Sequence, residues 1–151
     1  PLSLANSRAR LRMTALYSIS GSTNGIVVGT GNKVEDFGVG FFTKYGDGGV
    51  DISPIADLMK SEVFALGAAL DVLEDIQNAT PTDGLWNDGR TDEDQMGATY
   101  DELEWAMEHE ANPSGEALSE RQRTVLAIFR SFNTSNAHKM NPIPIFKRQD
   151  S

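Results

Sequence analysis

The sequence predicts an α/β fold in which helices cover a parallel β-sheet and a ligand binds at the carboxyl ends of the strands. The run Gly25–Thr30 is short, rich in β-branched residues and bounded by glycine, which is typical of a buried parallel strand. A glycine-rich stretch with two lysines and four acids follows this run and extends to Asp51. Because ligands bind at this edge of open α/β sheets, the stretch is the main candidate for a functional site.

The segments on either side of this strand predict a long helix and a second short strand. Small and apolar residues recur at helical spacing over Leu4–Ser20. Within this helix Arg8 and Arg12 lie one turn apart and face the same way, whereas Arg10 points elsewhere. Beyond the glycine-rich loop, Val50–Ile52 predicts the second strand.

The middle of the chain predicts one more helix and two loops. Ser53–Pro54 is a helix-start signal, because a hydroxyl cap precedes a proline at the first helical position. The apolar stripe that follows continues the helix to about Leu70, and Asp71 stands at a surface turn. The segments Thr80–Trp86 and Asn87–Gln95 are expected to be loops, the second of them acidic and mobile.

The last third predicts two helices and an extended tail. Thr99 and Glu102 form a capping box that opens a helix through about His109. The turn residues of Asn112–Gly115 end that helix. Helical spacing returns over Leu118–Phe132, and the proline-containing tail Asn133–Ser151 is expected to be extended.

Composition narrows the classes of protein to which the chain can belong. Its 151 residues are enough for one domain, expected to span residues 1–151, and its net charge of −9 disfavours a nucleic-acid partner. No apolar run reaches the length of about 18 residues that a transmembrane helix needs, so no membrane partner is expected. The sequence has no cysteine and no segment like a signal peptide, so a cytoplasmic location is expected.

Two longer sequence motifs resemble those of ammonia-dependent NAD synthetases. They are Gly-Phe-Phe-Thr-Lys-Tyr-Gly-Asp-Gly-Gly at Gly40–Gly49 and Thr-Asp-Gly-Leu-Trp at Thr82–Trp86, and the resemblance extends from Asn6 to about Lys139. It implies a three-layer, parallel-sheet nucleotide-binding fold of the ATP pyrophosphatase type. It also implies a homodimer, formed through the first helix, that amidates deamido-NAD with ATP and ammonia through an adenylated intermediate.

One departure from the family is large. The Ser-Gly-Gly-x-Asp-Ser loop that grips the ATP pyrophosphate in these enzymes does not occur in this sequence. The resemblance therefore implies the C-terminal part of a synthetase domain, with a fold that is incomplete at the N-terminus. This portion alone is expected to be inactive.

The resemblance also implies roles for individual residues, with Mg²⁺ as cofactor and ATP as co-substrate. Glu35 is the expected Mg²⁺ ligand, and Asp51 and Lys60 are the expected catalytic residues, with Asp51 holding ammonium or accepting its proton. The residues expected to contact ATP are Thr30, Lys60 and Thr82. Those expected to bind deamido-NAD are Arg10, Lys44, Asp51, His138 and Lys139, with Arg8 and Arg12 as alternatives to Arg10.

Two other functions fit the same residues. The chain could be the synthetase part of a glutamine-dependent enzyme; having no cysteine, it cannot itself form the thioester common among glutaminases. It could also be a non-catalytic nucleotide-binding or dimerisation module without an ATP loop. Each site residue also has an ordinary structural interpretation, such as a solvated loop carboxylate for Glu35 or an exposed helix lysine for Lys60.

Overall fold

The computed structural model describes residues 2–86 and 88–148, and helices dominate this part of the chain. The elements, in order, are α1 (Leu2–Thr23), the π-helix η1 (Lys33–Val39), α2 (Lys60–Ala69), α3 (Glu74–Gln77), α4 (Asp92–Met96), α5 (Tyr100–Ala111) and α6 (Glu120–Met140). None of these helices is long and apolar enough to cross a membrane.

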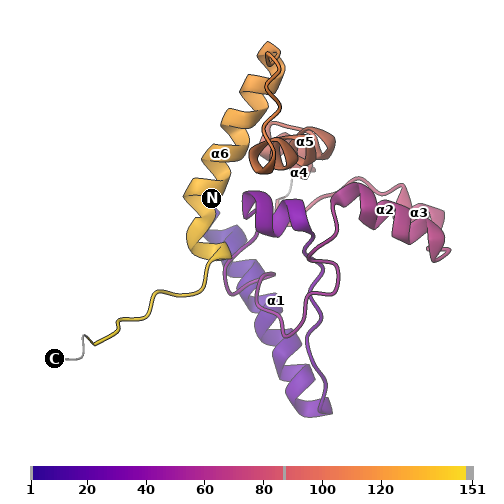
Figure 1. The fold of residues 1–151 in the computed structure, drawn as a ribbon. Helices are drawn as coiled ribbons and strands as arrows, with labels where there is room; N and C mark the ends of the chain where they lie inside the picture. Colours follow the sequence, from indigo (N-terminus) through magenta and orange to yellow (C-terminus); the bar gives the residue numbers. More distant parts are fainter. Residues whose placement is uncertain (1, 87, 149–151) are drawn as a thin grey trace.

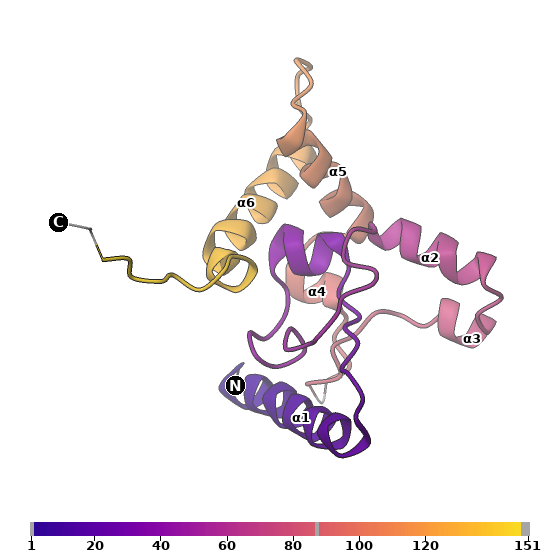
Figure 2. The ribbon, with the colours of Figure 1, turned by 60° about the horizontal axis from the view of Figure 1, so that its bottom comes forward.

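The helices are arranged around η1 and are joined by loops (Figure 1). Helices α5 and α6 pack against each other, η1 lies against both, and α1 lies on the other side of η1 (Figures 1 and 2). Helices α2 and α3 project to one side, and residues 142–148 run away from the body (Figure 2).

The hydrophobic core lies where α5, α6 and η1 meet. Leu103 on α5, Val125 on α6, and Val34 and Val39 on η1 are almost completely buried there. Their partners are Met96, Ala98, Tyr100, Ala106, Leu126 and Phe129. This packing holds η1 in place, and η1 carries Glu35, so the core directly positions a predicted site residue.

The first predicted helix is confirmed as α1, but it has almost no core. Only Ala5 and Ala9 of α1 are buried. Leu11 is 70% exposed and Ile19 is 61% exposed. Hydrogen bonds between its polar side chains and loops therefore contribute much of the interaction between α1 and the rest of the chain.

The predicted strands Gly25–Thr30 and Val50–Ile52 are wrong as regular strands. Over residues 2–86 and 88–148 the pairing is limited to one isolated parallel bridge between Val28 and Ile52, in which the Gly29 amide donates to the Ile52 carbonyl at 2.7 Å. Val28 and Ile52 are about half exposed. Two short strands without neighbours to cover their side chains do not make a stable sheet.

The predicted helix start at Ser53–Pro54 is also wrong, because α2 begins at Lys60 after a series of turns. The Leu58 carbonyl accepts a hydrogen bond from the Lys33 amide at 2.8 Å, so its partner lies in η1 rather than in α2. The helix is capped instead by Glu62, whose carboxylate accepts from the Met59 amide at 2.7 Å.

Two polar segments are more helical than their composition suggests. The acidic segment Asn87–Gln95, predicted as a mobile loop, contains the start of α4. Thr91 and Asp94 cap this helix reciprocally. Residue 87 lies outside the described part. Helix α6 starts after its Ser119 cap and continues through the predicted tail to Met140. The tail is extended only after that point, up to residue 148. The predicted capping box of Thr99 and Glu102 is confirmed at the start of α5.

Candidate functional site

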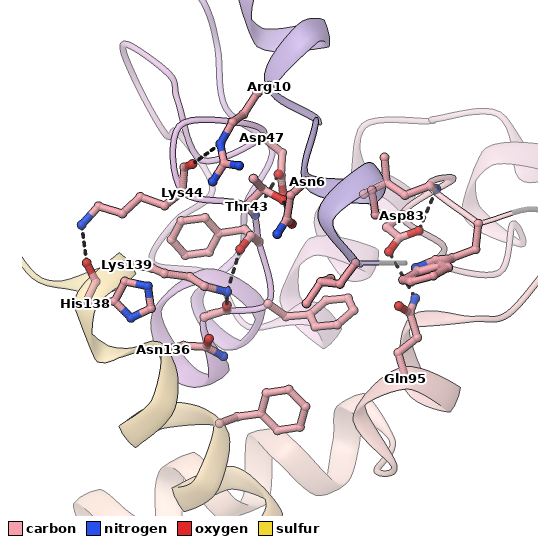
Figure 3. A pocket seen from close by; sticks show the side chains of 18 residues that line it. Asn6, Arg10, Thr43, Lys44, Asp47, Asp83, Gln95, Asn136, His138 and Lys139 are labelled. Atoms are coloured by element: carbon pink, nitrogen blue, oxygen red, sulfur yellow. Dashed lines mark hydrogen bonds between the residues drawn. The ribbon is translucent and has the colours of Figure 1, made fainter. Parts of the chain in front are cut away.

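A cavity of about 410 Å³ lies between α1, the glycine-rich loop, the loop before α4 and the end of α6 (Figure 3). Four predicted site residues line it: Arg10, Lys44, His138 and Lys139. They come from three segments that are far apart in the sequence. The remaining polar lining is Asn6, Thr43, Asp47, Asp83, Gln95 and Asn136.

Backbone carbonyls fix the cationic side chains of this cavity (Figure 3). The Arg10 Nε donates to the Lys44 carbonyl at 3.3 Å, and the Lys44 ammonium donates to the His138 carbonyl. Because a guanidinium has five N–H donors, Arg10 keeps donors available after making this bond. The two side chains therefore link α1, the glycine-rich loop and α6.

Three residues at helical spacing on α6 bind consecutive carbonyls at the end of η1. Asn133 donates to Gly38 and Asn136 to Val39, both at 2.8 Å. Lys139 donates to the Gly40 carbonyl at 2.9 Å and to the Phe42 carbonyl at 2.8 Å. Gly38 and Val39 end η1 and Gly40 is its C-cap, so their carbonyls lack partners inside the helix and α6 supplies them. Burial lowers the pKa of Lys139, while the charges of Asp47 and Asp36 oppose that shift.

Two acids lie close to this lysine. The Thr43 amide donates to the Asp47 carboxylate at 3.0 Å, which fixes the turn of the glycine-rich loop. Burial, followed by the negative charges of Glu35 and Asp47, raises the pKa of Asp36 to about 7. Because Lys139 only partly offsets this rise, negative charge is already crowded at this end of η1.

The three N-terminal arginines have different contacts. Arg8 donates to the Leu85 carbonyl at 2.6 Å, and Arg12 donates to the Gly84 carbonyl at 3.4 Å. Both therefore anchor the loop before α4 to α1, whereas Arg10 lines the cavity. This division follows the helical spacing, since Arg8 and Arg12 lie one turn apart on the same face.

A second cluster surrounds Glu35 on η1 and contains the predicted residue Lys60. The Lys60 ammonium is 2.9 Å from Glu35 Oε1, and both side chains are mostly buried. The Tyr100 hydroxyl donates to the same oxygen, and Asn32 donates through Nδ2 to Oε2. The Lys60 ammonium also lies 4.6 Å from the centre of the Tyr100 ring.

Asp92, at the start of α4, completes this cluster. Its Oδ2 lies 3.2 Å from the Tyr100 hydroxyl, and its Oδ1 is buried without a hydrogen-bond partner among the described residues. Burial and the nearby charge of Glu35 raise the pKa of Asp92. Burial and the same carboxylates also raise the pKa of Tyr100, which keeps its hydroxyl protonated as a donor.

The remaining predicted site residues lie apart from these two groups. Asp51 is exposed and accepts hydrogen bonds from the Val27 amide at 2.7 Å and from the Tyr17 hydroxyl at 3.1 Å. Thr30 lines a separate cavity of about 350 Å³ beside the bridge. Thr82 is exposed and follows Pro81, whose carbonyl accepts from the Asp92 amide at 3.1 Å.

Glu35 has the capacity for one further ligand such as Mg²⁺. An ionised carboxylate offers about four acceptor positions, and Asn32, Lys60 and Tyr100 occupy three of them. The described residues contain no group of three or more acidic, histidine or cysteine side chains arranged to hold a metal ion. One carboxylate still fits Mg²⁺, which keeps several waters and is bound largely by substrate phosphates.

Several polar residues that support these groups were not predicted from the sequence. Asn133 and Asn136 recur every three residues together with the predicted Lys139, which is a readable helical face, but Asn133–Ser151 is expected from the sequence to be extended. Asn32 caps η1 by accepting from the Val34 and Glu35 amides, and asparagine ahead of a helix is a usable signal. For Tyr100 and Asp92 the sequence contains no such signal, because the tertiary packing brings them to Glu35.

The chain is similar to NAD and NMN synthetases. A family model described as NAD synthase matches residues 1–143. The NH₃-dependent NAD⁺ synthetase of Alkaliphilus metalliredigens is 50% identical over 112 residues, which is 74% of this chain and 44% of that protein. The enzyme of the same name from Alkaliphilus oremlandii is 42% identical over 142 residues, which is 93% of this chain and 52% of that protein.

Solved structures give the same result. The chain superposes with a TM-score of 0.81 on the NMN synthetase of Francisella tularensis, at 38% identity over 95% of this chain and 56% of that one. For the NH₃-dependent NAD synthetase of Campylobacter jejuni in complex with the nitrate ion, the TM-score is 0.72, at 28% identity over 97% of this chain and 56% of that one. These synthetases have a nucleotide-binding α/β fold, and this chain spans about half the length of the curated relatives it matches.

Proposed function

This chain belongs to the NAD synthase family, and from that premise we propose that its protein amidates deamido-NAD to NAD with ATP and ammonia. The observation that supports this most is the convergence of Arg10, Lys44 and His138 on one cavity. A dinucleotide carries a negatively charged pyrophosphate, and an arginine and a lysine held at the cavity suit such a ligand. In this proposal Lys139 shapes the cavity wall by holding the glycine-rich loop as well as contacting the substrate.

The ATP side of the reaction is assigned to the Glu35 cluster. The nicotinate carboxylate attacks the α-phosphorus of ATP, pyrophosphate leaves, and ammonia then displaces AMP from the adenylate. No protein nucleophile takes part, so positioning and charge neutralisation supply the catalysis. Lys60 contacts the phosphates, Thr30 and Thr82 contact the nucleotide, and Glu35 holds Mg²⁺, which neutralises phosphate charge when bound.

Asp51 is proposed to act at the nicotinate end and to hold the incoming ammonium. Its carboxylate is exposed and already accepts two hydrogen bonds, which leaves it acceptor capacity. A carboxylate in this position can accept a proton when ammonium is converted to the attacking ammonia.

A homodimer through α1 is also proposed. The helix exposes large apolar residues that the described part of the chain does not cover, namely Leu2, Leu4, Leu11, Leu16 and Ile19. Exposed apolar surface of this extent on one helix is typical of a protein–protein contact. Sedimentation that shows only monomer at about 10–50 μM, where an interface of standard size persists, would contradict the dimer.

The similarity to an NMN synthetase supports a second candidate, in which the amidated product is the mononucleotide. Both candidates share the cation-lined cavity and the ATP cluster. They differ in whether the adenosine half of deamido-NAD contributes to binding.

The test uses the full-length protein with ATP, Mg²⁺ and ammonium, and compares deamido-NAD with its mononucleotide counterpart. We expect NAD, AMP and pyrophosphate in equal amounts and a higher kcat/KM for the dinucleotide. Lys44→Met should raise KM for deamido-NAD about 10–100-fold, because a charge-assisted contact is lost, and leave KM for ATP unchanged. The matched control Lys147→Met alters an exposed lysine in the extended tail and should change neither value. A wild-type protein that forms no NAD contradicts the proposal.

A further inference from the structure

We propose that Asp92 and Tyr100 are positioning residues that hold the Glu35 carboxylate and connect it to the loop that carries Thr82. The inference rests on the proposed function, since it assigns how the ATP side of that same site is held together. It concerns two residues in α4 and α5 that do not belong to the predicted site.

Tyr100 holds one oxygen of the Glu35 carboxylate. Its hydroxyl donates to Glu35 Oε1, the oxygen that also receives the Lys60 ammonium at 2.9 Å. Asn32 holds the other oxygen, Oε2. Three donors from three segments therefore fix the direction of one carboxylate. Partners of this kind around a metal-binding carboxylate orient it and keep one acceptor position aimed at the ligand.

Asp92 bonds to two different parts of the proposed site. Its carboxylate lies 3.2 Å from the Tyr100 hydroxyl, while its backbone amide donates to the Pro81 carbonyl at 3.1 Å. Pro81 directly precedes Thr82. One turn further along α4, Gln95 donates to the Asp83 carboxylate at 3.2 Å. Helix α4 thus fixes the loop on both sides of Thr82 to the cluster that contains Glu35.

This arrangement is unfavourable for Asp92 itself. Asp92 is only 7% exposed, and its Oδ1 has no hydrogen-bond partner among the described residues. A buried acceptor without a donor destabilises the folded state, and more so when it is charged. An apolar residue at this position would avoid that penalty. The acid therefore contributes something other than stability, and the group it contacts is the hydroxyl that holds Glu35.

The experiment measures nucleotide binding to the full-length protein rather than turnover. ATP affinity is measured by calorimetry with Mg²⁺ and again with a chelator, for the wild type, Tyr100→Phe and Asp92→Asn. Tyr100→Phe keeps the buried ring and its contact with Lys60 and removes one oxygen atom. We expect each variant to weaken Mg²⁺-dependent ATP binding about 10–100-fold, and to leave ATP binding in the chelator within about twofold.

The double variant and a control separate positioning from simple destabilisation. Because the two residues act in one chain of contacts, Tyr100→Phe with Asp92→Asn should be no weaker in Mg²⁺–ATP binding than the worse single variant. Asp101→Asn, on the exposed side of the same helix as Tyr100, should bind Mg²⁺–ATP like the wild type. If Asp92→Asn does not fold, Tyr100→Phe alone carries the test.

Several results would overturn the inference. They are equal losses with and without Mg²⁺, additive losses in the double variant, or unchanged binding in Tyr100→Phe. A wild type that binds Mg²⁺–ATP but makes no NAD would refute the proposed function and leave this inference standing. A wild type that binds no Mg²⁺–ATP would overturn both.

Discussion

Replacing Asp51 with asparagine tests how much this carboxylate contributes to the fold as well as to the reaction. Asp51 Oδ2 accepts from the Val27 amide at 2.7 Å, and Oδ1 accepts from the Tyr17 hydroxyl at 3.1 Å. These bonds tie α1 to the chain beside the bridge between Val28 and Ile52. Helix α1 buries only two of its residues, so it depends on such polar contacts.

The geometry sets the expected loss. Asparagine can accept from the Val27 amide through its one oxygen and donate to the Tyr17 hydroxyl oxygen through its NH₂ group, so what is lost is the charged acceptor of both bonds. A hydrogen bond to a charged acceptor contributes about 1.5–3 kcal/mol. Because Asp51 is exposed, water replaces part of the lost contact, and we expect the free energy of unfolding to fall by about 1–2 kcal/mol.

The assay is urea denaturation of the wild type, Asp51→Asn and Tyr17→Phe at pH 7. Tyr17→Phe removes only the weaker of the two bonds and should destabilise less than Asp51→Asn. Under the proposed function, Asp51→Asn should also raise the ammonium concentration needed for half-maximal rate and leave ATP affinity unchanged. Unfolding midpoints equal to that of the wild type would refute the structural argument, even if the rate falls.

Two further predictions concern the core side of the molecule. Gly40→Ala should lower the free energy of unfolding by about 2–4 kcal/mol, because Gly40 has a φ of +62° and the new Cβ would lie 2.6 Å from the Asn136 Cβ. The control Gly67→Ala, at a helical position with open space, should raise the free energy of unfolding slightly in the same urea denaturation assay. Arg121 lowers the pKa of Glu102 through a 2.6 Å hydrogen bond, so this contact stabilises the protein above the ordinary glutamate pKa. Arg121→Gln should therefore unfold at lower urea than the wild type at pH 7, and the difference should disappear as the pH falls through the lowered pKa; a constant difference would contradict this.

Several features of the fold could be predicted from local sequence. The helix over Leu4–Ser20 and the capping box of Thr99 and Glu102 are confirmed, because helical spacing and side-chain caps act over a few residues. The end of α6 could not be predicted in this way. Its last turns are polar, and they are helical where Asn133 and Asn136 bind carbonyls about 95 residues earlier in the chain.

The same distinction holds for the candidate site. The family resemblance implied one deamido-NAD group of Arg10, Lys44, Asp51, His138 and Lys139. The structure brings four of them to one cavity, and Asp51 lies outside it. The sequence left Arg8 and Arg12 open as alternatives to Arg10. Tertiary contacts separate them, because two of the arginines reach the carbonyls of Gly84 and Leu85 on a distant loop.

By itself the sequence determined the family, the local helix starts and the residue types that a nucleotide site requires, because motifs, caps and periodicity depend on neighbouring residues. Only the tertiary structure decided how those residues are supported. The two predicted strands remain one bridge because a pair of strands needs neighbours to cover it. Tyr100 and Asp92 join Glu35 because the packing of α5 against η1 and α6 brings them there, and no local signal records a contact between residues that far apart.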